Sequence, residues 1–135
     1  MRAKIKEYFE WKLSQVKSVI DVNIPITICN HGLIKDCEES LGLCHSVLVK
    51  GKYQTMNITI DGGYVQECYE NEIEGKLRFL PCSLFEVICH EIAHIKYKNQ
   101  HGKRHTALTQ KYLELIEESL SRKTENNFKK RYLNS

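Results

Sequence analysis

The sequence predicts an α+β fold with an N-terminal helix, a small and mostly antiparallel sheet of about three strands, a helix that carries ionisable residues, and a C-terminal helix. Three observations predict it. Apolar residues recur at helical spacing near both ends of the 135-residue chain. Short β-branched runs lie between them. An apolar segment at 83–98 holds two histidines and a glutamate within five residues. The length fits one domain, which we assign to residues 1–121.

The first element is an amphipathic helix expected over residues 3–20. Its apolar side chains recur every three or four residues, with charged residues between them. The stripe consists of Ile5, Tyr8, Phe9, Leu13, Val16 and Ile20. A helix of this kind is expected to bury one face against the rest of the domain.

The strands follow. Residues 24–29 are short and β-branched, and two further runs at 41–49 and 53–60 flank Lys50-Gly51-Lys52 as a hairpin. Within the second run Met56, Ile58 and Ile60 alternate, which predicts that they share one face.

Residues 61–80 have no clean period. We expect a short helix at about 65–72 and a short strand at 76–80. A segment of this length beside a site is a candidate substrate rim.

The ionisable helix has clear start and stop signals. Ser83 is the expected N-cap, Glu86 three residues later completes a capping box, and Gly102 is the expected stop. At about 100° per residue, the apolar side chains fall on one face and His90, Glu91 and His94 on another.

A last helix is expected over residues 103–121, followed by a basic and flexible tail at 122–135. Cationic side chains in this tail are candidate contacts for nucleic acid or another acidic partner. They are Arg122, Lys123, Lys129, Lys130 and Arg131.

The segment His90-Glu-Ile-Ala-His94 matches the pattern HExxH. Two histidines at i and i+4 lie one turn apart on one face, so both imidazoles can reach a single Zn²⁺ ion. Glu91 projects beside them and can act as a general base toward water rather than as a ligand. Burying three such groups without a partner would be costly, which favours a metal site.

A catalytic zinc ion usually has three protein ligands and one open position. Three residues are candidates for the third ligand. His101 follows the helix and is favoured, while Glu114 and His105 on the last helix are the alternatives.

The residues HEIAH and the downstream His101-Gly102 resemble the SprT-like family of zinc metallopeptidases, which are HExxH zincins. The order of elements and the strand sequence LGLC at 41–44 are also similar, so the resemblance covers about residues 40–120. It implies a minimal catalytic domain that hydrolyses peptide bonds with one Zn²⁺ ion and a metal-activated water. It also implies substrates among DNA-associated proteins.

Two further features of a peptidase can be sought in the sequence. An oxyanion stabiliser could come from Tyr97, Tyr112, Tyr64 or His105, among which the sequence does not choose. An edge strand, expected at 53–60, could hold an extended peptide.

Two other functions compete with this one. A metal-dependent endoribonuclease could also use histidines of this spacing, although it would not need Glu91. A non-catalytic, metal-stabilised structural or binding protein, such as a phage component, is the third interpretation.

Cysteine content and hydropathy indicate the compartment. The six cysteines form no CxxC pair and are expected to be reduced thiols. The charged N-terminus and the lack of a long apolar run predict a cytoplasmic protein without membrane segments.

Overall fold

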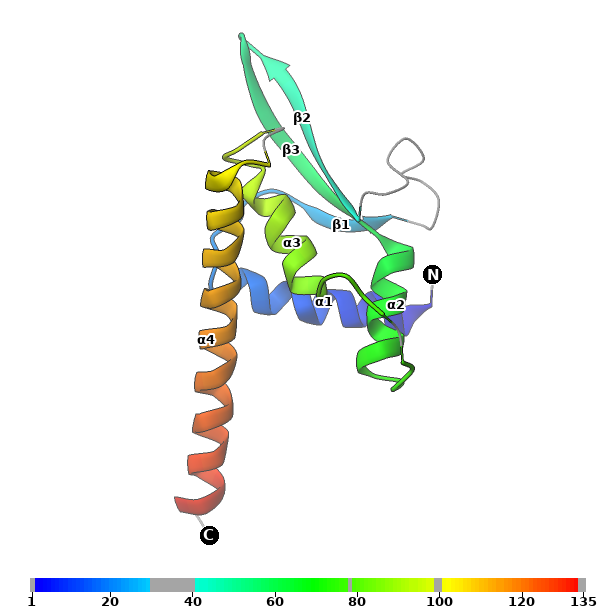
Figure 1. Cartoon of the computed structure of the whole chain (residues 1–135), viewed down its shortest axis with the longest axis vertical. Coiled ribbons are helices and arrows are strands. Elements are labelled where there is room, and N and C mark those ends of the chain that lie inside the picture. Colours follow the sequence, from blue (N-terminus) through cyan, green and yellow to red (C-terminus); the bar gives the residue numbers. More distant parts are fainter. Residues whose placement is uncertain (1, 30–40, 78, 99–100, 134–135) are drawn as a thin grey trace.

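The computed structural model describes residues 2–29, 41–77, 79–98 and 101–133, with side chains described up to residue 123. Four helices and a three-stranded mixed sheet make an α+β fold, as predicted. Figure 1 shows α3 between α4 and the sheet, with α1 crossing beneath α3. The β2–β3 hairpin projects on the side away from α1. In the described part of the chain, no helix has the length and apolar character needed to cross a membrane.

The sheet has the order β1-β3-β2. Strand β1 (Ile26–Cys29) pairs in parallel with β3 (Lys52–Asp61), and β2 (Gly42–Val49) pairs with β3 in antiparallel. The expectation that residues 53–60 form an edge strand is therefore wrong for residues 58–60, which pair with both β1 and β2, while among the described strands residues 53–57 pair with β2 alone. Strand β3 is the middle strand of the sheet, and β2 is the edge strand nearer to α3.

The hairpin turn follows its sequence signal. Lys50 and Gly51 both have positive φ, at 50° and 80°, and they join paired residues Val49 and Lys52. Two positive φ values in a two-residue loop are the signature of the turn whose twist matches that of the flanking strands.

One detail of β3 differs from its sequence pattern. Ile58 and Ile60 are fully buried as predicted, but Met56 is 50% exposed and Thr55 is buried in its place. The register explains the difference, because His45 pairs with Asn57 while Ser46 pairs with Thr55. Met56 is thus the extra residue of a β-bulge, and beyond it the alternation of faces is reversed.

Helix α1 (Ala3–Lys17) packs against both α2 (Gly62–Glu72) and α3, and Figure 1 shows it crossing beneath α3 from α2 toward α4. The side chain of Asp61 caps α2 by accepting a hydrogen bond from the Gly63 amide at 3.3 Å. The strand expected at 76–80 is not present in the described residues. Lys76 instead donates its backbone N–H to the Glu70 carbonyl, and Leu77 and Phe79 are exposed.

Helix α3 (Leu84–Ala93) begins as predicted, with the Ser83 hydroxyl accepting a hydrogen bond from the Glu86 amide at 3.1 Å. It ends at His94, well before Gly102. The amides of Ile95 and Lys96 bond three residues back, which tightens the last turn. The second histidine of the motif therefore lies at the C-cap of the helix.

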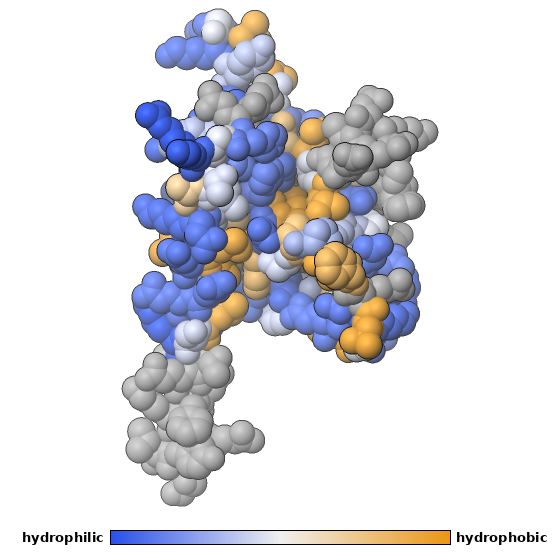
Figure 2. Space-filling model, in the orientation of Figure 1, coloured by the Kyte–Doolittle hydropathy of each residue, from blue (hydrophilic) through white to orange (hydrophobic). Residues whose placement is uncertain are grey.

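Helix α4 spans Lys103–Leu133, so the predicted end near residue 121 is wrong and the helix continues through the segment assigned to a tail. The apolar pattern fades after Leu120, yet no glycine or proline interrupts residues 103–133, so no strong helix breaker is present. In the face shown in Figure 2, hydrophilic residues dominate the described surface of α4, and hydrophobic residues appear between it and the body.

The five described cysteines are free thiols, as expected, and Cys37 lies outside the described residues.

Candidate metal centre

Three histidines converge where α3 meets the start of α4. His90, His94 and His105 each offer a ring nitrogen, and these nitrogens all lie within 4.8 Å of one another. His94 and His105 are buried and His90 is half-buried. The three residues therefore lie close enough to bind one metal ion.

The two histidines of the motif have the spacing that two ligands of one ion require. Their Nε2 atoms are 3.2 Å apart. Two nitrogens at the usual 2.0–2.1 Å from a tetrahedral ion would be about 3.3 Å apart. One turn of α3 thus presents both nitrogens to a shared position.

A backbone carbonyl orients His94. Its Nδ1 lies 3.0 Å from the carbonyl oxygen of Tyr97, which can only accept a hydrogen bond. The proton of the neutral ring is therefore on Nδ1, and Nε2 keeps its lone pair toward His90. Hydrogen bonds of this kind commonly fix the tautomer of metal-binding histidines.

A second carbonyl orients His105, here through Nε2 rather than Nδ1. Its Nε2 donates to the His90 carbonyl oxygen at 2.9 Å, so Nδ1 is the nitrogen left for an ion. His105 is in the first turn of α4, and the Thr109 hydroxyl donates to its carbonyl at 3.0 Å. The hydrogen bond between His105 and the His90 carbonyl joins the start of α4 to α3.

The imidazoles are also in the right protonation state for ligands. Burial, together with the neighbouring rings of His105, His94 and His101, lowers the pKa of His90 to about 4. Burial likewise lowers the pKa of His94. Both rings are neutral at pH 7, as metal binding requires.

The favoured third ligand, His101, lies beside this group rather than in it. Its ring centroid is 4.7 Å from that of His94 and 5.3 Å from that of His90, and its side chain is exposed. The alternative Glu114 is exposed on α4, where it accepts a hydrogen bond from Gln110 at 3.4 Å, and it is not part of the group. The remaining alternative, His105, completes the three nitrogens.

Glu91 is the least satisfied buried group of the site. Only 5% of this residue is exposed, and its Oε2 has no hydrogen-bond partner among the described residues. Burial raises the pKa of its carboxyl to about 7. A carboxyl with this pKa can both accept and return a proton near neutral pH.

Gly42 on β2 makes room for Glu91. A Cβ atom at residue 42 would lie 2.8 Å from Cγ and 3.2 Å from Cδ of Glu91, which is closer than real contacts allow. The edge strand can therefore pass directly over the glutamate only because residue 42 has no side chain.

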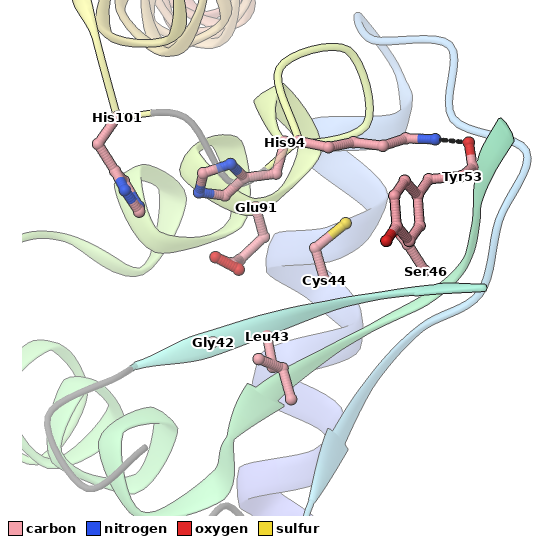
Figure 3. A pocket seen from close by; sticks show the side chains of 9 residues that line it. Gly42, Leu43, Cys44, Ser46, Tyr53, Glu91, His94 and His101 are labelled. Carbon is pink, nitrogen blue, oxygen red and sulfur yellow. Dashed lines mark hydrogen bonds between the residues drawn. The ribbon is translucent and has the colours of Figure 1, made fainter. Parts of the chain in front are cut away.

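A cleft runs between β2 and α3 with Glu91 at its centre. Figure 3 shows Glu91 pointing from α3 toward β2, with the rings of His94 and His101 turned toward each other beside it. One half of the cleft is lined by Cys44, Ser46, Tyr53, His94 and Lys98. The other half is lined by Leu41, Cys82, Glu86, Val87 and His90, and both halves share Gly42, Glu91 and His101.

The residues proposed as oxyanion stabilisers lie in different surroundings. The Tyr64 hydroxyl donates to the Cys82 carbonyl, and Tyr112 packs half-buried against the core. Tyr97 contributes its carbonyl to His94, and His105 belongs to the ligand group. Tyr53, which the sequence did not single out, lines the cleft.

The candidate nucleic-acid contacts lie along the C-terminal half of α4. Arg122 pairs with Glu118 one turn earlier, and Lys123 is exposed. Lys129, Lys130 and Arg131 are within the helix, and their side chains lie outside the described ones.

Cleft residues other than the motif had little signal in the sequence. Gly42, Cys44 and Ser46 are spaced by two, as residues on one face of a strand are, but that spacing becomes informative only once β2 is known to be an edge.

Comparisons of this chain with protein-family models, curated proteins and solved structures gave no match.

Proposed function

We propose that this chain is a zinc-dependent metallopeptidase that hydrolyses peptide bonds with Glu91 as general base. The observation that carries the proposal is the buried Glu91 carboxylate, whose Oε2 lacks a hydrogen-bond partner among the described residues and lies beside three converging imidazoles. Burying an unpaired carboxylate costs free energy, so a ligand is expected to bind beside Glu91 and offset that cost.

His90, His94 and His105 would hold the ion. Three imidazoles without a described thiolate or carboxylate in the group suit Zn²⁺, which commonly takes three protein ligands in catalytic sites. When bound, Zn²⁺ supplies an acidic water and polarises the scissile carbonyl.

The other steps belong to the residues of the chain. Glu91 takes a proton from the attacking water, because its pKa of about 7 matches neutral conditions, and passes that proton to the leaving amine. His101 lines both halves of the cleft and can donate a hydrogen bond to the carbonyl oxygen as negative charge develops on it.

Strand β2 supports a peptide rather than another kind of substrate. An extended chain can add to an exposed strand edge through main-chain hydrogen bonds, with little dependence on its own sequence. Strand β2 borders the cleft along Gly42 to Ser46, so a chain added to this strand would lie beside Glu91.

The test is hydrolysis by Glu91→Gln. Zinc-loaded wild type is expected to cleave an unfolded protein substrate, and Glu91→Gln to lose about 10²- to 10⁴-fold in rate while binding zinc equally. The exposed Glu114→Gln is the matched control and is expected to retain the rate. If zinc raises the melting temperature of wild type and of Glu114→Gln but neither protein cleaves any peptide bond, the metal has a structural role and the proposal is wrong. Zinc-dependent cleavage of RNA instead of protein would favour an endoribonuclease.

A further inference from the structure

Three lysines surround a second pocket that adjoins the cleft. This pocket of ≈ 660 Å³ is large enough for several side chains, and its lining includes Lys50, Lys52 and Lys98. Tyr53 and Lys98 line both this pocket and the His94 side of the cleft, so the two spaces adjoin. A chain that leaves the cleft on this side therefore enters a cationic region.

The positive charge of this region is not neutralised within the described part of the protein. None of the ion pairs formed by described residues includes Lys50, Lys52 or Lys98. No aspartate or glutamate lines the pocket either. Three lysines that line one space without an ion-pair partner among the described residues favour an anionic ligand there.

Lys98 is held in place at the junction of the two spaces. Its ammonium group donates a hydrogen bond to the Tyr53 carbonyl, which Figure 3 shows as a dashed line, and the side chain is half-buried. One of its three N–H donors is used in this contact, so two remain for a ligand. A lysine fixed in this way loses less entropy on binding than a free surface lysine does.

The opposite half of the cleft has the reverse charge. Glu86 lines it beside the apolar Leu41 and Val87, and no lysine or arginine is among its lining residues. An acidic substrate segment is therefore attracted to one half of the cleft and repelled from the other.

The direction of β2 relates these halves to the two sides of a scissile bond. Strand β2 runs from Gly42 near Glu86 toward Ser46 near Lys98. Antiparallel pairing is the more stable arrangement for an added strand. A substrate antiparallel to β2 would place the residues before the scissile bond beside Lys98 and those after it beside Glu86.

We propose that the cleft selects polypeptides with acidic side chains on the N-terminal side of the scissile bond, which Lys98 and the Lys50–Lys52 turn bind as carboxylates. This inference rests on the proposed peptidase function and names its substrate class. Lys98 is a specificity-determining residue here, because it contacts the substrate away from the reacting atoms.

The experiment compares two quenched-fluorescence peptides of identical composition. In the first, three glutamates precede a central apolar segment and three lysines follow it; in the second, the order of the charged blocks is reversed. Wild type is expected to have a kcat/KM about tenfold higher for the first peptide at low salt. Lys98→Glu is expected to abolish or invert this ratio, and added salt should weaken the preference of the wild type.

Lys96→Glu is the matched control, because it makes the same change of charge at an exposed position that does not line either space. It is expected to keep the preference. Equal cleavage of both peptides by wild type, or an unchanged preference in Lys98→Glu, would overturn the inference and leave the peptidase function intact.

A binding measurement separates failure of this inference from failure of the proposed function. Fluorescence anisotropy of both peptides with zinc-loaded Glu91→Gln needs no turnover. Tighter binding of the first peptide that is lost with Lys98→Glu supports the cationic site even if wild type cleaves nothing. Equal binding of both peptides, without cleavage, overturns the cationic site as well as the peptidase.

Discussion

Two regions of this protein bury charged groups, and they treat them differently. Where α1 meets α2, the ammonium group of Lys12 is 2.8 Å from a Glu72 carboxylate oxygen, and the Tyr8 hydroxyl donates to the other oxygen at 2.6 Å. In the cleft, Glu91 is as buried as Lys12, and its Oε2 has no described partner.

The surroundings of the two regions reinforce this difference. Lys12 also lies over the rings of Trp11 and Phe85, at 4.7 and 4.6 Å from their centroids. Glu91 instead faces an open cleft between β2 and three imidazoles. Natural proteins usually satisfy their buried polar groups, so the first region is complete as a structural contact and the second is prepared for a ligand.

Crowding the cleft is expected to give the largest effect. Gly42→Ala puts a methyl group 2.8 Å from Glu91 Cγ, so the glutamate or the strand must move. We expect a loss of tenfold or more in kcat, since small misplacements of catalytic groups are costly, and a destabilisation of about 1–3 kcal/mol from overpacking. Peptide hydrolysis and urea denaturation measure the two quantities.

Gly102→Ala is the control for this change, because no atom lies within 4 Å of a Cβ at residue 102. If Gly42→Ala keeps the wild-type rate, Glu91 does not need the position that the edge strand leaves for it.

Breaking the satisfied pair should cost stability without affecting the metal site. Lys12→Met removes the cation and leaves Glu72 without its ion-pair partner. A fully buried pair would cost about 3–5 kcal/mol, but Glu72 is partly exposed, so we expect about 2 kcal/mol. Urea denaturation of Lys12→Met and of the exposed Lys6→Met, with zinc titrations of both, checks this.

A fall in zinc affinity in Lys12→Met would erase the distinction between the two regions. An unchanged free energy of unfolding would show that the Lys12–Glu72 pair adds nothing to stability.

The smallest effect on stability is expected from neutralising the unsatisfied carboxylate of Glu91. Burial raises the Glu91 pKa to about 7 in the folded, metal-free protein, from 4.5 when unperturbed. The folded state is therefore penalised progressively as the pH rises from about 4.5 to about 7. Metal-free Glu91→Gln should be about 1 kcal/mol more stable than wild type at pH 8, because its amide also lacks partners, and the gain should shrink toward pH 4.5.

Free energies of unfolding against pH, for both metal-free proteins, measure this difference. A Glu91→Gln variant that is less stable than wild type at pH 8 would mean that the carboxylate has a stabilising partner.

Local patterns predicted much of the fold. The Ser83 cap, the Lys50-Gly51 turn and the buried stripe of α1 follow from short-range spacing, and all three are confirmed. Long-range pairing was harder, because no local pattern in residues 53–60 indicates that β1 pairs with the end of this strand opposite β2. The bulge at Met56 is also a property of two strands together, so β3 alone could not reveal it.

The residues of the site also divide into those that a local pattern predicted and those that depend on long-range packing. His90, Glu91 and His94 share one helix, so the period of that helix placed them together. His105 and His101 come after α3, so the period of that helix cannot predict which of the two rings lies nearer to His90 and His94. Gly42, Tyr53 and Lys98 join the site only through the placement of β2 over α3, and the sequence has no local signal for that packing.

Zinc K-edge X-ray absorption on protein loaded with one equivalent of zinc tests the central assignment most directly. Three imidazole nitrogens at about 2.0–2.1 Å are expected in wild type and in His101→Ala, and two in His105→Ala. The opposite pattern, in which His101→Ala loses an imidazole and His105→Ala keeps all three, would contradict this assignment, as would an ion without histidine ligands.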